Sequence, residues 1–380
     1  ASAVSRGLGE LVRVIIRGAY LRDLESEFAS YRAGESVLVR VRVVNEGIRE
    51  QRVRVTVFAR PAPGGEEIPV FSQEAAIPPG QSVAVSGSWG LPEDISGLVR
   101  LRAVVEDGEG NAFDELESGF VALPGEPSTG SGVLTFSGNY LRPGGRAMFL
   151  FGSDNYANVY TSSCEGPLWW DREHRASRDF GFRIYENLQY SNPDYRLKEV
   201  DRRRFAGMAA LTQQHRLVFM PCLLVGHNVA ISDDLLAAQS RQCREYADLL
   251  GETPGLLWYI NGDYQLRYDR EGPLGELWRT FLLERYGSSD AVRRAWGRPA
   301  GADAGEIPFP PETGTAWDER VAMDKTRFNL WLMTRWNAAH VAAIRSRDRV
   351  HPITSEYYSF PFDGMDLRLT IGDQDVSNIG

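Results

Sequence analysis

The period of the hydrophobic residues changes once along this chain, and that change most constrains its fold. Up to about residue 125, apolar and polar residues alternate in short runs, as in Ser36–Val44. A period of two is typical of strands that are buried on one face. Beyond about residue 134, apolar runs of strand length take turns with segments of helical period. The chain therefore divides into an all-β part and a part in which strands and helices alternate.

The first part predicts seven short strands separated by turns rich in glycine and proline. They are expected at Leu11–Arg17, Ser36–Val44, Arg52–Ala59, Ile68–Gln73, Ser82–Trp89, Leu98–Glu106 and Ala112–Ala122. Seven strands at this spacing indicate an immunoglobulin-like β-sandwich over residues 1–125. No residue pattern in it points to chemistry, so we expect a spacer or a docking surface.

A linker is expected at residues 126–133, which are rich in glycine, proline and serine. After it, a hairpin is expected at 134–145, and strands at Ala147–Gly152, Phe182–Glu186, Leu217–Val225, Leu256–Tyr264, Ile353–Glu356 and Asp375–Asn378. Helices are expected around 171–180 and at Asp201–His215, Ser232–Leu250, Gly275–Arg285, Ser289–Trp296 and Thr315–Arg345. This order indicates βαβ units, and residues 134–380 predict a (β/α)8 TIM barrel of which about six strands are present.

Asp263 stands where an apolar run, Leu256–Ile260, gives way to polar residues. In parallel α/β sheets the chemistry is placed at the carboxyl ends of the strands. A carboxylic acid there, beside aromatic rings, is the pattern of a site that protonates a glycosidic oxygen. An aspartate that only caps the next loop is the alternative, and position alone does not decide between them.

Three stretches of the second part follow a family pattern. They are Trp258–Tyr264, Leu277–Gly297, and His351–Glu356 together with Asp375–Ser377. In these stretches the chain resembles the retaining β/α-barrel glycoside hydrolases, and most of all the family 42 β-galactosidases. The resemblance implies retaining hydrolysis of β-linked sugars, a carbohydrate substrate, no cofactor, and self-association, with Asp263 in the position of the acid/base.

The chain also departs from the family pattern. Gly262 and Asp263 occupy the positions of the family's Asn-Glu pair, and Asn261 lies one place earlier. Glu186 falls where the family has an arginine. The family's nucleophile is a glutamate at the end of strand seven, and the 380 residues end after strand six. We therefore expect this sequence to be a fragment of a longer barrel, or to receive the missing part from a partner.

Other polar and aromatic residues follow the predicted strands and are candidates for the same site. Glu356 is a candidate second carboxylate, with a salt-bridged glutamate at a strand end as the alternative. Candidate sugar-binding residues are Asn155, Tyr156, Trp169, Trp170, Glu186, His227, Asn228, Asn261, Tyr264 and Asn378. For each of these, capping a loop or packing in a core is the alternative interpretation. The tryptophans and His340 of the long last helix follow the helical period and are expected to be packing residues.

Because Gly262 and Asp263 stand in place of the family's Asn-Glu pair, a second class of function remains open. A degenerate barrel could bind glycans without turnover, or build an extracellular assembly through its sandwich. Detectable hydrolysis that depends on one carboxylate distinguishes the enzyme from this alternative.

Charge and composition exclude several other partners. The net charge of −9 is spread along the chain, which disfavours nucleic acid, and no run approaches the roughly 20 apolar residues of a membrane span. No metal-binding cluster or phosphate-binding glycine loop is present in the sequence. The chain starts without a signal peptide, which fits a mature secreted or cell-surface protein and leaves a cytoplasmic one open. Cys164, Cys222 and Cys243 permit either one disulfide or three thiols.

Overall fold

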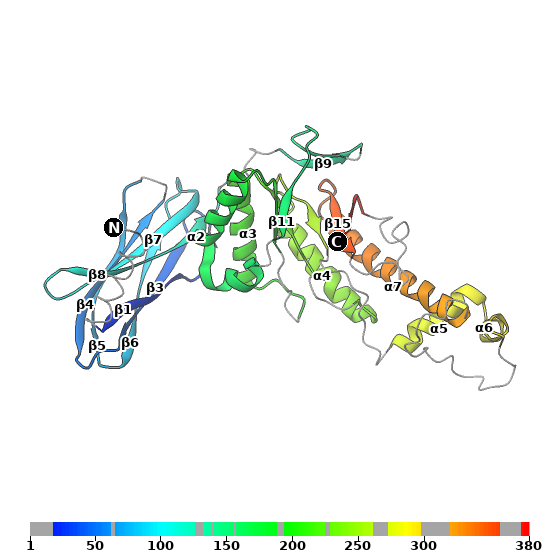
Figure 1. Cartoon of the computed structure of the whole chain (residues 1–380), viewed down its shortest axis with the longest axis horizontal. Helices are drawn as coiled ribbons and strands as arrows, with labels where there is room; N and C mark the ends of the chain where they lie inside the picture. Colours follow the sequence, from blue (N-terminus) through cyan, green and yellow to red (C-terminus); the bar gives the residue numbers. More distant parts are fainter. Residues whose placement is uncertain are drawn as a thin grey trace.

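The computed structural model describes residues 18–61, 65–125, 132–138, 140–154, 157–187, 194–224, 229–260, 273–297, 320–357 and 374–379. For 153, 154, 157–165, 356, 357 and 377–379 it describes the backbone alone. Figure 1 shows an elongated molecule, with a sandwich of strands at one end and strands flanked by helices beside it. Among the described helices, none combines the length and the apolar character that crossing a membrane requires.

Two sheets build the N-terminal part. One has the order β1-β3-β6, with β1 at Ala19–Ser26, β3 at Ser36–Asn45 and β6 at Gln81–Gly90. The other has the order β2-β8-β7-β4-β5, with β2 at Ser30–Tyr31, β8 at Ala112–Ala122, β7 at Gly97–Glu106, β4 at Gln51–Arg60 and β5 at Ile68–Ile77. One hydrophobic core takes residues from both sheets. The structure thus has a sandwich of two sheets, and the immunoglobulin-like topology stays a prediction.

Strand β3 shows why the alternation predicts this part well. Its valines at 37, 39, 41 and 43 are fully buried, while Arg40 and Arg42 point outward. Arg42 pairs there with Asp23 of the neighbouring strand at 3.0 Å. The period of two therefore sorts the side chains into core and solvated face, as the sequence indicates.

Strand β1 is not anticipated from the sequence. The predicted first strand, Leu11–Arg17, lies outside the described residues. In β1 the pairing register with β3 shifts between Leu21 and Asp23. An irregularity of this kind breaks the period of two, so the segment lacks the alternation by which the other strands are recognised.

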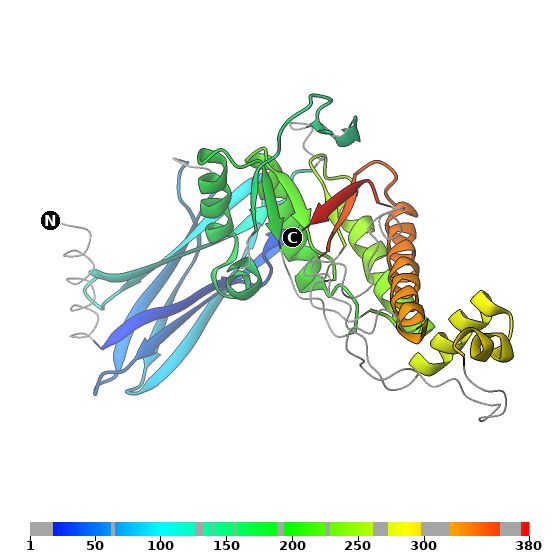
Figure 2. The ribbon, with the colours of Figure 1, turned by 45° about the vertical axis from the view of Figure 1, so that its right-hand side comes forward.

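Within the described residues of the second part, six parallel strands follow in chain order. Strands β11 (Gly152–Asp154), β12 (Ile184–Asn187) and β13 (Val218–Pro221) form one group, and β14 (Trp258–Tyr259), β15 (Ile353–Tyr357) and β16 (Val376–Ile379) form the other. Parallel bridges from Phe219 to Leu256 and from Cys222 to Tyr259 join the two groups. Figure 2 shows these strands curving around one another with the helices on one side. The described strands thus form an open, curled parallel sheet, as in part of a β/α barrel.

Helices fill the connections between these strands. They are α2 (Ala157–Asp179), α3 (Glu199–Gln214), α4 (Asp233–Leu250), α5 (Leu274–Tyr286), α6 (Ser289–Ala295) and α7 (Arg320–Arg345). Ser232 caps α4 as expected, because its side chain accepts a hydrogen bond from the Leu235 N–H at 3.2 Å. Helix α2 is much longer than expected. Gly166, at φ +60°, and Pro167 interrupt it, and in the sequence this pair resembles a loop.

The two faces of the parallel sheet are covered differently. Phe219, Trp258 and Ile353 belong to the large core that the helices cover. Val218, Leu257, Tyr259 and their neighbours form a smaller core on the opposite, inner face. The predicted hairpin, β9 (Leu134–Ser137) with β10 (Tyr140–Pro143), closes that core, since Leu134 is fully buried in it. The Leu134 N–H donates to the Pro254 carbonyl at 2.8 Å, which fixes the hairpin below strand β14.

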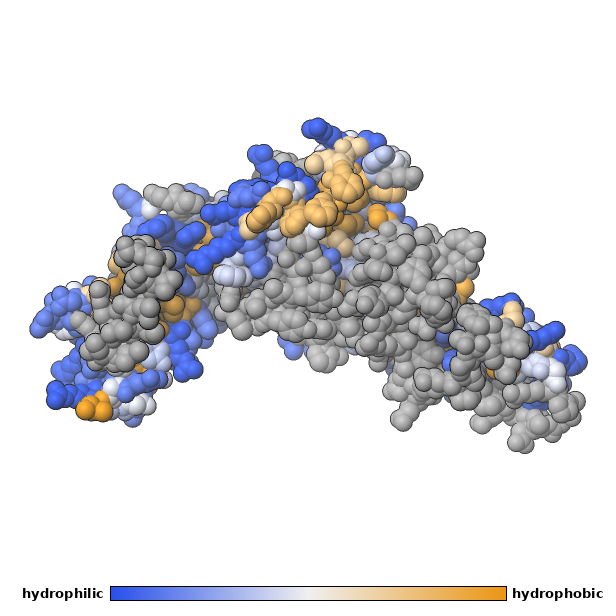
Figure 3. All heavy atoms as spheres, in the orientation of Figure 1, coloured by the Kyte–Doolittle hydropathy of each residue, from blue (hydrophilic) through white to orange (hydrophobic). Residues whose placement is uncertain are grey.

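The predicted strand Ala147–Gly152 is wrong except for its last residue. Met148 makes only an isolated bridge to the hairpin, and Phe149 and Phe151 are 87% and 58% exposed. Figure 3 shows hydrophobic residues gathered on the surface over this segment and the hairpin. An apolar run alone does not fix a strand, because pairing with a neighbour decides where the strand begins.

Two of the three cysteines are free thiols. Cys222 and Cys243 are both buried, and burial raises the pKa of Cys243 to about 12. Cys222 lies in the inner core and Cys243 in the helix-covered core, so the sheet separates them. A disulfide between these two cysteines is therefore not formed, and the side chain of Cys164 lies outside the described residues.

Candidate active site

The carboxyl ends of the first three parallel strands lie side by side. Asp154 of β11 is in register with Glu186 of β12, and Glu186 is in register with Met220 of β13. Glu186 is half-buried at this edge. Arg183, one residue before β12, donates a hydrogen bond to the Phe182 carbonyl at 3.0 Å. The strand register thus places one candidate residue, Glu186, at the edge where a barrel carries its chemistry.

Strands β14, β15 and β16 are aligned in the same way. Tyr259 pairs with Thr354, and two residues further along β15, Glu356 pairs with Asn378 of β16. Tyr259 and Thr354 are both buried, and the Thr354 hydroxyl has no hydrogen-bond partner within the described residues. The structure therefore brings together the strand positions of two predicted site residues, Glu356 and Asn378.

The backbone of β14 is held on both sides. The Leu257 N–H donates to the Phe219 carbonyl of β13 at 2.9 Å. On the other side, the Trp258 N–H donates to the Pro352 carbonyl at 2.9 Å, and the Ile260 N–H donates to the Thr354 carbonyl at 3.0 Å. These bonds fix the strand directly before the segment that contains Asp263.

A buried polar network fixes the side of β14 that faces the helices. The fully buried Trp258 donates its indole N–H to Asp348 at 2.7 Å. Asp348 also contacts His351 Nδ1 at 2.8 Å and accepts the Val350 N–H at 2.9 Å. Burial opposes the charge of Asp348, but these hydrogen bonds outweigh it and lower the pKa of the carboxyl to about 2. Asp348 is therefore ionised at neutral pH and acts as a fixed acceptor behind the strand.

Arg345 extends this network to the last two strands. Its guanidinium donates to the His351 carbonyl at 2.7 Å and pairs with Asp375. Asp375 also accepts the Ile353 N–H at 2.8 Å, at the start of β15. The sequence does not predict this network. The only local signal is the spacing of Asp348 and His351, three residues apart immediately before a strand.

Most of the remaining predicted site residues lie outside the described residues. They are Asn155, Tyr156, His227, Asn228, Asn261, Asp263 and Tyr264. For Glu356 and Asn378 the backbone alone is described. Their roles in substrate binding or catalysis stay predictions.

Trp169 and Trp170 lie on a different side of the molecule from the strand ends. Both belong to helix α2, rather than to a loop after the first strand. Trp170 is 1% exposed and is part of the helix-covered core, so it is not available to stack on a sugar. Trp169 is 38% exposed and faces the sandwich, where it lines a cleft with residues of β1 and β8. The interpretation of these two residues as a stacking platform at the barrel mouth is therefore corrected.

The packing role expected for the last long helix is confirmed within the described residues. Phe328, Leu332 and Ile344 are fully buried in the helix-covered core. His340 is buried as well, and its ring lies edge-on to the Trp336 ring with 4.9 Å between the ring centroids. Neither ring nitrogen of His340 has a hydrogen-bond partner among the described residues. Burial lowers the pKa of His340 to about 3, so the ring is neutral.

No group of three histidine, cysteine, aspartate or glutamate side chains with the geometry of a metal site occurs among the described residues. The residues at the ends of β12, β15 and β16 include the carboxylate residues Glu186 and Glu356 and the amide residues Asn187 and Asn378. These groups transfer protons and bind hydroxyl groups.

A sequence comparison links the second part of the chain to one enzyme family. Residues 227–378 match the family described as β-galactosidase (glycoside hydrolase family 42). The matched segment contains Asp263, Glu356 and Asn378 and covers less than half of the chain. No curated protein sequence matches the chain.

Solved structures of glycosidases are also similar to this chain. The cold-adapted β-galactosidase from Rahnella sp. R3 has a TM-score of 0.49 and 15% identity, with 60% of this chain and 38% of that chain covered. The β-galactosidase from Marinomonas ef1 has a TM-score of 0.47 and 15% identity, with 56% and 38% covered. A β-glucuronidase from Bacteroides uniformis has a TM-score of 0.37 and 10% identity, with 96% and 36% covered.

The chain thus spans well under half of the length of these solved proteins. The link to a sequence family rests on residues 227–378. The matched residues include β14, β15 and most of β16, together with the sequence positions of Asp263 and Glu356. The resemblance of the second part of this chain to the family 42 β-galactosidases, which three stretches of its sequence indicate, is confirmed.

Proposed function

We propose that the barrel part acts as a retaining glycosidase on β-linked sugars, with Asp263 as the general acid/base. The match of residues 227–378 to a β-galactosidase family supports the reaction class. The choice of galactose as the sugar rests on that family match alone.

The register of β14 with β15 carries this proposal. Tyr259 and Thr354 are paired, and Tyr259 belongs to the inner core. If the period of two continued along both strands, positions 263 and 356 would share the face of Tyr259 and Thr354, with position 261 opposite 356 and position 263 two residues beyond it. Neighbouring strands lie about 4.8 Å apart, and retaining glycosidases hold their two carboxyl groups about 5–5.5 Å apart. A two-residue offset adds about 7 Å along the strand, so Asp263 and Glu356 reach that spacing only where their side chains converge.

In the proposed reaction Asp263 protonates the glycosidic oxygen while a second carboxylate attacks the anomeric carbon. The leaving group departs as an alcohol, and a glycosyl ester forms on the second carboxylate. Asp263, now ionised, takes a proton from water, which hydrolyses the ester and restores both groups. Glu356 is the candidate second carboxylate within these residues, and the family resemblance implies a glutamate on a seventh strand for the same role.

Asp263→Asn tests the acid/base role through the leaving group. The variant should lose about 10²–10⁴-fold in kcat/KM on lactose, whose leaving alcohol needs protonation. On 2,4-dinitrophenyl β-galactoside it should lose much less in the bond-cleavage step, because that leaving group departs as an anion. Asp94→Asn, at an exposed aspartate of the sandwich, is the control and should hydrolyse both substrates at the wild-type rate.

Equal and small losses on both substrates would contradict a role for Asp263 as proton donor. The hydrolysis rates of Glu356→Gln on the same substrates test whether Glu356 is the second carboxylate. A loss in bond cleavage regardless of leaving group identifies Glu356 as the nucleophile, whereas an effect on KM alone leaves it a binding residue.

A glycan-binding protein without turnover is the second candidate function. Gly262 and Asp263 in place of the family's Asn-Glu pair favour it, because the amide that would bind the sugar is missing and the acid is one methylene shorter. Absence of hydrolysis by the wild-type chain on both substrates, together with measurable sugar binding, would support this candidate over the enzyme.

A further inference from the structure

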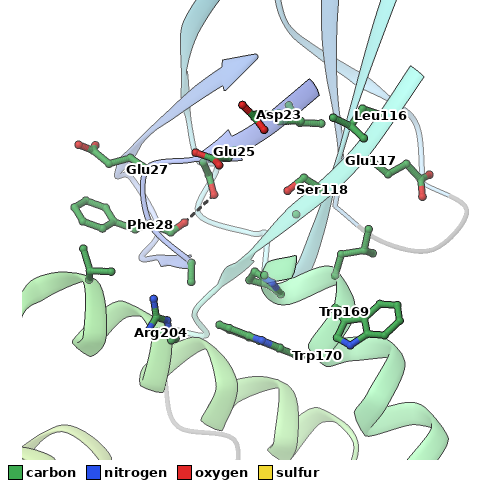
Figure 4. A pocket seen from close by; sticks show the side chains of 18 of the residues that line it. Asp23, Glu25, Glu27, Phe28, Leu116, Glu117, Ser118, Trp169, Trp170 and Arg204 are labelled. Atoms are coloured by element: carbon green, nitrogen blue, oxygen red, sulfur yellow. Dashed lines mark hydrogen bonds between the residues drawn. The ribbon is translucent and has the colours of Figure 1, made fainter. Parts of the chain in front are cut away.

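A cleft of about 550 Å³ lies at the seam between the sandwich and the parallel-sheet part. Figure 4 shows it between the edges of β1 and β8 on one side and the helices α2 and α3 on the other. It lies on the outer side of α2 and α3, and these helices separate it from the parallel sheet. Ligand sites are often found at such boundaries between domains.

Direct contacts between the two parts hold the walls of this cleft in place. Arg203 of α3 pairs with Glu35 through two hydrogen bonds of 2.6 and 2.8 Å. The Ser30 hydroxyl donates to the Arg203 carbonyl at 2.6 Å, and Arg203 lies over the Phe28 ring at 5.3 Å. Val121 of β8 belongs to the same core as the helices. The cleft is therefore preformed, and binding in it does not require the two parts to close on each other.

After the break in α2, an aromatic side chain stands at the rim of the cleft. Helix geometry resumes after Gly166, and Leu168 packs closely enough on β8 that a Cβ at Gly119 would lie 3.7 Å from it. Trp169, the next residue, is 38% exposed and lines the cleft. Its indole N–H donates to Glu173 at 3.1 Å, and Glu173 accepts from the Tyr185 hydroxyl at 3.0 Å. These bonds fix the ring and leave an exposed apolar surface.

The charges around the cleft are mixed and nearly balanced. Four carboxylates and three guanidinium groups line it. Glu25 and Glu27 are exposed and make no ion pair within the described residues, while Glu117 lies 3.8 Å from Arg172. A strongly anionic ligand would meet the carboxylates and a strongly cationic one the arginines. A neutral ligand with many hydroxyl groups can donate to the carboxylates and accept from the guanidinium groups.

We propose that this seam cleft binds a neutral saccharide, with Trp169 stacking on the apolar face of a sugar ring. The carboxylates and guanidinium groups around it bind the hydroxyl groups of the same ligand. The site is separate from the one at the strand ends, and it rests on the proposed function only in that the ligand is a carbohydrate. It needs no catalytic residue.

Electrophoresis of the full chain through native gels cast with polysaccharides tests this proposal. The probes are four neutral polymers, namely β-1,4-galactan, arabinogalactan, xyloglucan and glucomannan, and the acidic polygalacturonan. We expect at least one neutral polymer to retard the wild type and polygalacturonan to retard it least. Trp169→Ala should weaken that affinity about tenfold, which is the loss expected when a contact that buries roughly 50 Å² of the ring face is removed.

Matched variants separate stacking from a general effect on the fold. Trp169→Phe should recover part of the affinity, since it keeps an aromatic ring. Phe180→Ala, at an exposed aromatic residue near the end of the same helix segment, should bind like the wild type. Glu25→Gln combined with Glu27→Gln changes only exposed side chains of the rim and should weaken binding by a smaller factor.

Asp263→Asn in the same gels distinguishes this site from the strand-end site. Retention that Trp169→Ala abolishes and Asp263→Asn preserves supports the seam site, whether or not the chain hydrolyses glycosides. Retention that Asp263→Asn abolishes and Trp169→Ala preserves places all binding at the barrel mouth and overturns the seam site. No retention in any neutral polymer, or stronger retention in polygalacturonan, also overturns it. Loss of hydrolysis in Asp263→Asn bears only on the proposed function.

Discussion

The sandwich and the parallel-sheet part place their ionisable side chains in opposite ways. In the sandwich, Glu67 pairs with Arg60 and Arg102 on the outer face, where all three side chains keep contact with solvent. In the parallel-sheet part, Asp348 and His351 are paired at 2.8 Å with side chains only 3–4% exposed, and they hold the central strand β14 from behind. The described part of the sandwich therefore keeps its charged groups on the outer face, whereas the sheet part also depends on charged groups buried within its packing.

Removing Asp348 should produce the largest loss of stability. Asp348→Ala leaves the indole N–H of Trp258 and the His351 ring buried without their acceptor. It should lower the free energy of unfolding by about 3–5 kcal/mol. Urea unfolding at pH 7, followed by circular dichroism, measures this loss. Asp248→Asn is the matched control, because Asp248 forms an exposed ion pair with Arg347 at 3.0 Å, and it should cost less than about 1 kcal/mol.

The pH dependence of the same site follows from the sign of its pKa shift. The pKa of Asp348 is lowered in the folded state from its usual 3.8 to about 2, so its charge stabilises the fold above pH 3.8. This contribution is lost as the pH falls from 3.8 through about 2. The stability difference between the wild type and Asp348→Asn should therefore shrink across that window. A difference that stays constant down to pH 2 would contradict the ionised acceptor.

His340 offers a change of opposite sign. Its ring is fully buried with neither nitrogen bonded within the described residues. His340→Leu should therefore raise the free energy of unfolding by about 1–2 kcal/mol at pH 7, since it removes two unsatisfied polar atoms from an apolar site. Thermal unfolding measures the change. His340→Gln, which keeps polar atoms at the same position, is the control and should not stabilise the chain.

The effect of His340→Leu should grow as the solution becomes more acidic. The pKa of His340 is lowered by burial from 6.5 to about 3, so the unfolded chain takes up a proton between these values and the folded chain does not. Wild-type stability should therefore fall as the pH falls from 6.5 towards 3. In the variant the fall should be shallower, and His174, whose pKa burial also lowers to about 3, accounts for part of what is left. Parallel curves for wild type and variant would contradict this assignment.

The two parts also differ in how much of them can be predicted from the sequence. The alternation of Ser36–Val44 predicts β3 and its buried valines, because a half-buried strand needs no information beyond its own residues. Strand β1 escapes prediction, since an irregular register between Leu21 and Asp23 removes the alternation. Ala147–Gly152 is an apolar run that resembles a buried strand. Most of its residues have no neighbouring strand to pair with, so the run alone gives a wrong prediction.

The candidate site is harder to predict for the same physical reason. The family pattern points to Asp263 and Glu356 because each lies in a short segment whose own residues resemble the family's motif. The polar network behind β14 joins Trp258 to Asp348, 90 residues away, and no local period reveals a contact at that separation. Trp169 and Trp170 look like a sugar platform next to a predicted loop. The helix that contains them is recognisable only once Gly166 and Pro167 are placed inside it.

Replacing Glu67 by glutamine should have the smallest effect of these changes. Glu67 lies 2.6 Å from both Arg60 and Arg102, and the hydrogen bond from Arg102 is the main cause that lowers the pKa of Glu67. Its side chain still reaches water, so the loss should stay within about 1 kcal/mol and shrink further in 0.5 M salt, which screens exposed charges. Thermal unfolding at 0.05 and 0.5 M sodium chloride measures both quantities. A loss above 2 kcal/mol that salt does not reduce would show that the sandwich, like the parallel sheet, depends on a shielded ionic network, and the contrast between the two parts would not hold.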